Sequence, residues 1–334
     1  MNPLQQLLQT EDHILLDGAM GTILMGRGLE QGAPPESWNL IHPEQIQAVH
    51  QEYIEAGSRL ILANAFGGSR QRLKLHKLDT QVVEINRAAG KIARAAAEAA
   101  PHKVIIGASI GPTGELFEPM GELTFEDAKS AFAEQAIGLS EGGVEIFWIE
   151  TMSDLQEVKA AIAGIRSVCD LPIAATMTFD TNGHTMMGVS PLKALEELLA
   201  LDLAAIGANC GNGPAEIEAV IKAMHEKSPE TILVAKSNAG IPQLIKGELS
   251  YDGTPEIMAL YAKRVRKLGA RLIGGCCGNH PEHMRAMADA LSGTAVISTT
   301  TTATYDGLVT TNGNGNGRST PKPARERKFR RKRN

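Results

Sequence analysis

The feature that most limits the fold of this 334-residue chain is a strand-like run followed by a helix-like stretch, repeated eight times. Short apolar, β-branched runs alternate with amphipathic stretches of helical spacing. The predicted strands span residues 14–16, 59–63, 103–108, 145–149, 172–178, 204–208, 232–236 and 271–274. The predicted helices span residues 43–56, 81–99, 125–141, 155–168, 192–201, 215–225, 255–268 and 281–291. Strict alternation of this kind requires a parallel sheet.

Eight such units predict an α/β protein with a single (β/α)8 TIM barrel over residues 1–295. A doubly wound open sheet stays an alternative, because alternation alone does not distinguish the two folds. In a barrel, the chemistry lies in the loops at the carboxyl ends of the strands. Polar residues and glycines gather there, in residues 17–22, 64–68, 109–114, 150–152, 179–183, 209–211, 237–240 and 276–278.

Three of the four cysteines belong to these loops. Cys210 and the adjacent pair Cys276 and Cys277 end short apolar runs, and a glycine follows each group. Their sulfurs can project from buried strands toward one point, and three thiolates suit Zn²⁺ while leaving its fourth position open. Buried free cysteines are the alternative interpretation. Cys169 precedes a predicted strand, at the opposite end of the sheet, and is interpreted as structural.

The charge of such a metal centre limits its chemistry. Zn²⁺ and three cysteinate ligands together carry a net negative charge, which makes the metal centre a poor generator of hydroxide. The centre can instead take up a substrate thiol, deprotonate it at neutral pH and keep its sulfur nucleophilic. The sequence therefore predicts attack by a substrate thiol on an electrophilic carbon.

Over residues 10–292 the chain resembles the zinc-dependent homocysteine S-methyltransferases. This family includes the homocysteine domain of cobalamin-dependent methionine synthase and betaine–homocysteine methyltransferase. The resemblance rests on the motifs at residues 17–22, 109–112, 150–151, 209–211 and 274–278. It implies that a zinc-bound homocysteine thiolate takes a methyl group from a donor and becomes methionine. Cys210, Cys276 and Cys277 would be the zinc ligands and would act in catalysis through the metal.

The resemblance also implies where the amino acid end of homocysteine binds. Asp17 and Glu150 would accept hydrogen bonds from its ammonium, and backbone N–H groups of Gly18, Ala19 and Met20 would bind its carboxylate. Without the cysteines, the two acids at strand ends would suggest a glycoside hydrolase pair.

Several other residues have a structural explanation beside the functional one. Asn64 and Ser109 would either contact the substrate or hold their own loops. Asn209 would orient the neighbouring cysteine or satisfy backbone groups. His280 would either be a fourth zinc ligand or begin the last helix. Residues 184–187 would form either a mobile lid or a packed loop.

The methyl donor is less constrained by the sequence. Betaine carries a quaternary ammonium, which proteins bind over aromatic faces, and aromatic residues make up only 4% of this chain. Where animal betaine enzymes have tyrosines after the second and fourth strands, this chain has Gly67 and Thr151. The remaining candidates for an aromatic cage are Trp38, Tyr53 and Phe117. An animal-type betaine cage is therefore not expected.

Residues 120–124 and 186–190 look more like the homocysteine domain of the cobalamin-dependent enzymes, and the chain ends where their folate and cobalamin domains would begin. We therefore expect a methyl-accepting subunit that receives methyl, derived from methylcobalamin or methyltetrahydrofolate, from a separate corrinoid protein. Betaine and S-methylmethionine are the alternative donors, and selenocysteine or another thiol is the alternative acceptor.

Charge is divided unevenly along the chain. The formal net charge is −5, yet nine Lys or Arg and a single Glu lie from Arg318 onward. Residues 296–334, rich in Thr, Gly and Asn and then in basic residues, predict a disordered linker and basic tail. Nucleic acid is not the expected partner, because Phe329 alone could stack on bases in the basic cluster. A zinc-bound scaffold with a nucleic-acid-binding tail is the non-enzymatic alternative.

The chain has no apolar run near the roughly 20 residues that span a bilayer and no signal-peptide pattern at its start. We therefore expect a cytoplasmic protein without membrane contact.

Overall fold

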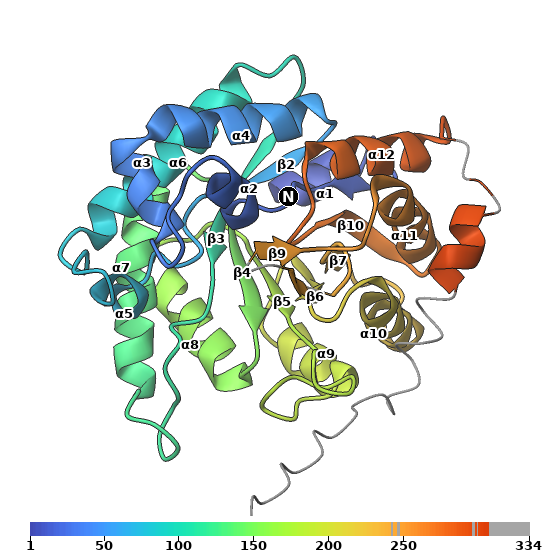
Figure 1. The fold of residues 1–334 in the computed structure, drawn as a ribbon. Coiled ribbons are helices and arrows are strands. Elements are labelled where there is room, and N and C mark those ends of the chain that lie inside the picture. Colours follow the sequence, from blue (N-terminus) through green and yellow to red (C-terminus); the bar gives the residue numbers. More distant parts are fainter. Residues whose placement is uncertain (242, 246–247, 296–297, 299, 307–334) are drawn as a thin grey trace, which may run out of the picture.

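The computed structural model describes residues 1–241, 243–245, 248–295, 298 and 300–306. Eight parallel strands form one sheet in the order β1-β10-β7-β6-β5-β4-β3-β2. A bridge between Leu16 and Leu60 joins the two outermost strands of that order. The sheet is therefore a ring, surrounded by helices (Figure 1). The predicted (β/α)8 barrel is confirmed, and the open doubly wound sheet is wrong.

All eight predicted strands are present, with ends that differ by no more than a few residues. They are β1 (Ile14–Leu15), β2 (Leu60–Ala63), β3 (Ile105–Ile110), β4 (Ile146–Met152), β5 (Ile173–Met177), β6 (Ala205–Cys210), β7 (Leu233–Ser237) and β10 (Ala270–Gly275). Between β7 and the next helix lies an antiparallel hairpin that the periodicity did not predict, β8 (Gln243–Ile245) and β9 (Glu248–Ser250).

All eight predicted helices are also present. They are α4 (Pro43–Glu55), α6 (Val82–Glu98), α7 (Phe125–Glu141), α8 (Leu155–Arg166), α9 (Pro191–Leu199), α10 (Pro214–Lys227), α11 (Pro255–Lys267) and α12 (Pro281–Ser292). Side chains cap several of them, because Thr124, Asp154, Ser190 and Thr254 each accept a hydrogen bond from a first-turn N–H. Such caps satisfy backbone donors that the helix itself leaves free.

Five short helical segments within the first 74 residues were not predicted. They are α1 (Pro3–Leu7), α2 (Gly21–Gly26), the 3₁₀ turn η1 (Pro35–Ser37), α3 (Trp38–Ile41) and α5 (Arg70–Lys74). Apart from α1, they lie in the loops that follow β1 and β2, so they help to build the carboxyl-terminal rim of the barrel.

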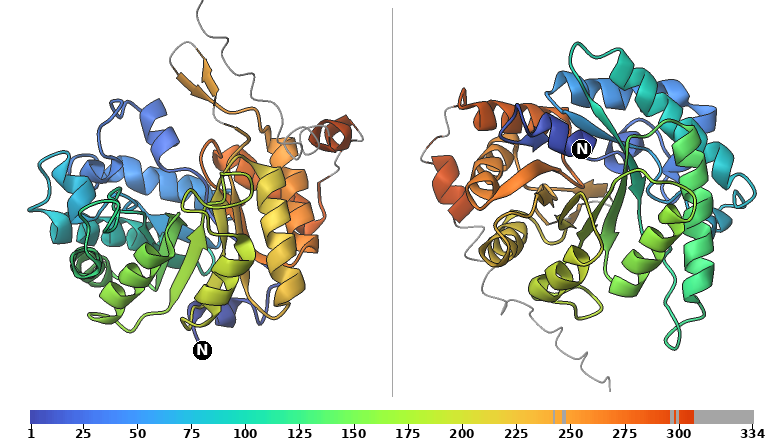
Figure 2. Two further views of the ribbon diagram at one scale, coloured as in Figure 1. Left: turned by 90° about the horizontal axis from the view of Figure 1, so that it is seen from below. Right: turned by 180° about the vertical axis from the view of Figure 1, so that it is seen from behind.

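Apolar side chains fill the inside of the barrel. This inner group contains Ile14, Leu60, Ile105, Ile146, Trp148, Val234 and Leu272. Leu4 and Leu7 of α1 pack into the same group, so α1 covers the amino-terminal end of the barrel. Figure 2 shows the chain's start at the end opposite to the β8–β9 hairpin. With that end packed, the cavity for chemistry is left to the carboxyl-terminal rim.

Part of the predicted tail packs against the barrel. Residues 300–306 are helical, and Tyr305 is only 1% exposed. Its ring lies under the Arg264 guanidinium of α11, 4.5 Å from the ring centroid, and its hydroxyl donates to Glu218 of α10. For residues 300–306 the predicted disorder of the segment 296–334 is therefore wrong, because the Tyr305 ring is buried against the barrel. The basic cluster from Arg318 lies outside the described residues, and the boundary at residue 295 stays a prediction.

Among the described residues, no helix has both the length and the apolar character that crossing a lipid bilayer requires.

Candidate metal centre and amino acid pocket

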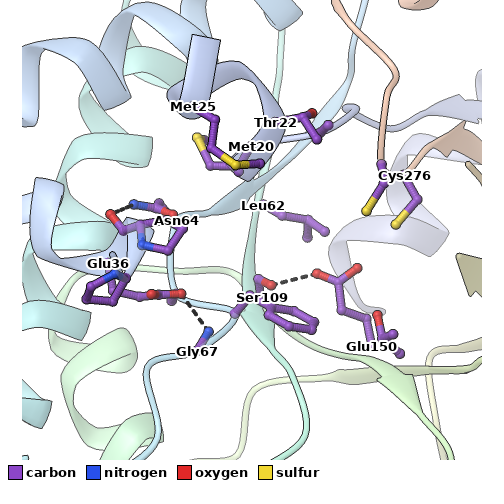
Figure 3. A pocket seen from close by; sticks show the side chains of 18 of the residues that line it. Met20, Thr22, Met25, Glu36, Leu62, Asn64, Gly67, Ser109, Glu150 and Cys276 are labelled. Atoms are coloured by element: carbon purple, nitrogen blue, oxygen red, sulfur yellow. Dashed lines mark hydrogen bonds between the residues drawn. The ribbon is translucent and has the colours of Figure 1, made fainter. Parts of the chain in front are cut away.

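A cavity of about 490 Å³ opens at the carboxyl ends of the strands. Every residue predicted to bind metal or substrate lines it, namely Asp17, Gly18, Ala19, Met20, Asn64, Ser109, Glu150, Cys210, Cys276 and Cys277. Figure 3 shows Cys276 and Glu150 reaching into this cavity from different strands. The structure therefore brings together residues that are up to 260 positions apart in the chain.

The three predicted metal ligands form one cluster. Cys210 is the last residue of β6, and Cys276 and Cys277 directly follow β10. The Sγ atoms of Cys210 and Cys276 are 3.2 Å apart, and all three sulfurs lie within 4.8 Å of one another. Sulfurs bound to one zinc lie about 3.5–4 Å apart, so small rotations of the side chains suffice to hold the ion. The donor set of three thiols fits zinc.

Backbone contacts fix the two loops that carry the cysteines. Cys210 and Gly211 both adopt positive φ, 62° and 69°, which turns the chain sharply at the end of β6. The Asn238 side chain then joins the loops, since its Nδ2 donates to the Gly211 carbonyl and its Oδ1 accepts from the Cys277 N–H. Asn238 was not singled out from the sequence.

Asn209 satisfies a backbone group, as one interpretation expected, but the cysteine that its side chain contacts is Cys276 and not its neighbour Cys210. Its Oδ1 accepts hydrogen bonds from the Thr151 N–H at 2.8 Å and from the Thr176 hydroxyl at 2.6 Å. Its Nδ2 donates to the Thr151 hydroxyl and also faces the Cys276 Sγ at 3.8 Å. Asn209 thus satisfies a buried backbone N–H and orients a sulfur of the cluster.

The thiols differ in acidity because they are hydrogen-bonded to one another. Hydrogen bonds from Cys210 and then Cys276 lower the pKa of Cys277, whereas the hydrogen bonds of Cys210 with Cys276 and then Cys277 raise the pKa of Cys210. The Tyr251 hydroxyl is hydrogen-bonded to Cys277 as well, which lowers the pKa of that thiol further. A metal ion that binds here displaces the remaining thiol protons, so its affinity depends on pH.

Beside the cysteines, a chain of buried charges crosses the floor of the cavity. Lys236, near the end of β7, lies between the two carboxylates predicted to bind the substrate ammonium. Its Nζ is 3.3 Å from Asp17 Oδ1 and 3.7 Å from Glu150 Oε2. Asp17 Oδ2 also accepts the Leu62 N–H at 2.7 Å, and Glu150 Oε1 accepts the Ser109 hydroxyl at 2.6 Å. The sequence analysis missed Lys236, although a lysine at the end of an apolar strand was a signal.

Burial and attraction compete at these three groups. Burial raises the pKa of both carboxyls, and the pKa of Asp17 reaches about 6 because desolvation outweighs the attraction of Lys236. Burial alone would lower the pKa of Lys236, but the charges of Glu150 and then Asp17 raise it above its ordinary value. Lys236 is therefore protonated at neutral pH.

The turn after β1 offers fewer free donors than expected. The Ala19 N–H already donates to the Asn279 carbonyl at 2.9 Å. Gly18 must be a glycine, because a Cβ there would lie 2.5 Å from the same carbonyl oxygen and 2.8 Å from the Tyr53 hydroxyl. Of the three N–H groups predicted to bind a carboxylate, those of Gly18 and Met20 are the better candidates.

Asn64 and Ser109 hold other parts of the site. The Asn64 Nδ2 donates to the Pro35 carbonyl and to Asn39 Oδ1, so the amide ties the loop after β2 to η1 and α3. Ser109 donates to Glu150, as described above. Glu36, which the sequence analysis did not single out, also lines the cavity and accepts a hydrogen bond from the Gly67 N–H at 2.6 Å. Figure 3 shows this hydrogen bond and the one from Ser109 to Glu150.

The aromatic residues at the cavity are not the predicted ones. Trp38, Tyr53 and Phe117 are 8%, 1% and 3% exposed and belong to the core. Phe66 and Tyr251 line the cavity instead.

The remaining candidates also have clear positions. His280 is the N-cap of α12, and the cysteine cluster does not include it, so the helix-start interpretation is correct. In the loop after β5, Met186 is 70% exposed and Thr185 is fully buried. Cys169 lies before β5, at the other end of the barrel, where its sulfur is 3.5 Å from the Ser140 hydroxyl.

Fold and site together define a barrel enzyme in which three thiols converge beside a pocket of buried charges. The model of the homocysteine S-methyltransferase family matches residues 14–291. The chain belongs to this family, and it is a methyltransferase. The non-enzymatic scaffold alternative is therefore not supported.

Individual relatives agree with the family. The chain is 30% identical over 295 residues to methionine synthases of Mycobacterium leprae and Mycobacterium tuberculosis; the match covers 83% of this chain. It spans only 24% of the length of those relatives. The metallated form of the homocysteine methyltransferase MmuM from Escherichia coli superposes with a TM-score of 0.74 at 24% identity, over 86% of this chain and 99% of that one. A methyltransferase from Methanosarcina mazei reaches a TM-score of 0.55 at 12% identity, over 85% of this chain and 94% of that one. Both structures support the fold.

Proposed function

We propose that this protein transfers a methyl group to the thiol of homocysteine and forms methionine. The observation that carries the proposal is the convergence of Cys210, Cys276 and Cys277 beside two carboxylates that suit an amino acid. Zn²⁺ held by the three cysteines would act as the Lewis acid that lowers the pKa of the substrate thiol.

The chain's own residues would orient the substrate. The carboxylates of Asp17 and Glu150 would accept hydrogen bonds from the homocysteine ammonium, and the Gly18 and Met20 N–H groups would bind its carboxylate. Because Glu150 and Cys276 both reach into the same cavity, an amino acid anchored at Glu150 would direct its thiol toward the cysteine cluster. Proximity of this kind is a large part of the rate enhancement of enzymes.

For the methyl donor, we favour a separate corrinoid module that carries methyl from methylcobalamin or methyltetrahydrofolate. The support is the likeness to a segment of the mycobacterial methionine synthases, which are much longer than this chain. A subunit of this kind needs a cavity that is open to a bulky cofactor.

A small cationic donor, S-methylmethionine or betaine, is the second candidate. The observation that favours it is that Phe66 and the buried carboxyl of Glu36 line the same cavity as the cysteine cluster. Aromatic faces and carboxylates attract sulfonium and quaternary ammonium groups. Selenocysteine or another thiol as acceptor would use the same cysteine cluster.

Three neighbouring thiols remain reduced in the cytoplasm, where disulfides are rare, and we propose that compartment as the protein's setting.

The test is to incubate zinc-loaded protein with homocysteine and with each donor separately, and to quantify methionine by mass spectrometry. Methionine formed with methylcobalamin alone would support the split synthase. Methionine formed with S-methylmethionine or betaine would overturn the corrinoid donor and keep the methyl transfer. Competition between homocysteine and selenocysteine would rank the acceptors.

A further inference from the structure

Lys236 is one of the most buried charged residues that the structure describes. It is 2% exposed and lies on the cavity floor. Lysine is almost never fully buried unless its ammonium is paired. Here the Nζ atom faces Asp17 Oδ1 at 3.3 Å and Glu150 Oε2 at 3.7 Å, so the ammonium occupies the space between the two acids.

Each carboxylate has a second, separate anchor. Asp17 Oδ2 accepts the Leu62 N–H, and Glu150 Oε1 accepts the Ser109 hydroxyl. Ionised, the two carboxylates carry two negative charges, and protonated Lys236 leaves the floor with one. Two buried carboxylates without a counter-charge are costly to keep ionised and in place.

We infer that Lys236 is a positioning and specificity-determining residue, which acts on the substrate through Asp17 and Glu150. By balancing one of the two carboxylates, it leaves a floor with one net negative charge. That charge matches an acceptor with one protonated α-amino group. The inference rests on the proposed function, because it assumes that the acceptor is an amino acid.

The alternative role for Lys236 is direct contact with the carboxylate of the substrate. The two roles differ in how they depend on Asp17. If Lys236 compensates the Asp17 charge, then removing the Asp17 charge makes Lys236 dispensable. If Lys236 binds the substrate itself, its loss costs the same whether Asp17 is charged or not.

A double-mutant cycle with two matched ligands separates these roles. The variants are Lys236→Met, Asp17→Asn and the double variant, all zinc-loaded. Titration calorimetry measures their affinity for L-norleucine and for hexanoate, which differ only by the α-ammonium. Neither ligand has sulfur, so binding is independent of the metal and of methyl transfer. If the protein fails to methylate homocysteine yet binds norleucine normally, only the proposed function fails.

Lys236→Met should weaken norleucine binding by roughly 30-fold or more, because a partner of buried charges is lost. It should also abolish the preference for norleucine over hexanoate. In the Asp17→Asn background Lys236 cancels the Glu150 charge, so the same change restores a floor with one negative charge. It should therefore lower norleucine affinity by no more than about fivefold, and the double variant should prefer norleucine, since Glu150 then stands alone with its Ser109 anchor.

Equal costs of Lys236→Met in both backgrounds would overturn the inference in favour of direct contact. Unchanged or tighter norleucine binding by Lys236→Met would overturn it as well. If Lys236→Met does not fold, the double variant alone tests the inference, because its floor has the same net charge as that of the unaltered protein. It should fold and prefer norleucine, and a folded double variant without that preference contradicts the inference.

Discussion

Gly278, which follows the cysteine pair, is where a single methyl group would disturb the metal centre. Its φ is +78°, a conformation that favours glycine. A Cβ at this position would lie 2.3 Å from Cγ of Tyr251. The Tyr251 hydroxyl is hydrogen-bonded to Cys277, so the ring and the glycine are packed against each other beside a metal ligand. Gly278→Ala should therefore destabilise the fold and displace Tyr251.

The magnitude has two parts. Positive φ costs an alanine about 1–2 kcal/mol, and moving a packed ring costs about 1–3 kcal/mol more. Gly188→Ala is the matched control: its φ is +79°, and among the described residues, apart from Gly188 and its two chain neighbours, no heavy atom lies within 4 Å of its added Cβ. Gly188→Ala should lose only the stability that positive φ costs an alanine, about 1–2 kcal/mol. The difference between the two variants then measures the contact with Tyr251.

Urea denaturation gives the free energies of unfolding, and chelator competition gives the zinc affinity. Gly278→Ala should be less stable than Gly188→Ala by about 1–3 kcal/mol and should bind zinc more weakly. Adding Tyr251→Ala to Gly278→Ala should recover most of that difference, since the clash is removed. Equal stability of the two glycine variants, with unchanged zinc affinity, would refute the packing described here.

Three further predictions concern single residues. Cys277→Ser should lose zinc and activity with little change in stability, because the barrel has its own core, whereas Cys169→Ser should keep both; metal analysis and methionine assays decide. Burial lowers the pKa of His50 to about 4, so its contribution to stability is complete above pH 6.5 and is lost as pH falls from 6.5 to 4, about 3 kcal/mol in all. Urea denaturation at pH 7.5 and at pH 4 should show this loss in the free energy of unfolding. In His50→Leu the loss between the two pH values should be smaller by about 3 kcal/mol. Burial raises the pKa of Asp17 to about 6, so norleucine affinity should fall as pH drops through 6; an identical pH profile for Asp17→Asn would contradict this.

The sequence was sufficient to predict the barrel because each element repeats a local pattern. Strands such as β2 and β5 are buried along their whole length and read as largely apolar runs. Long helices such as α6 show their apolar face over several turns. Short elements escape this reasoning. The six residues of α2 and the β8–β9 hairpin are too short for a period to be recognised.

The site was predictable where its residues lie at or soon after the carboxyl end of a strand. The cysteines have this position, and strands of a closed barrel bring such residues to one rim. Tyr251 and Glu36 lie within long connections, whose paths depend on tertiary packing. Lys236 lies near the end of its strand as well, but its importance comes from Asp17, which follows β1, and Glu150 of β4, which only the closed ring places beside it.

The most direct test of the account is to measure bound zinc and methionine formation in the same preparation, while zinc is removed with a chelator and then restored. We predict one zinc per chain at full loading, methionine formation that falls in proportion to the zinc removed, and recovery when zinc returns. Full methionine formation by the zinc-free protein would contradict a metal centre built from Cys210, Cys276 and Cys277.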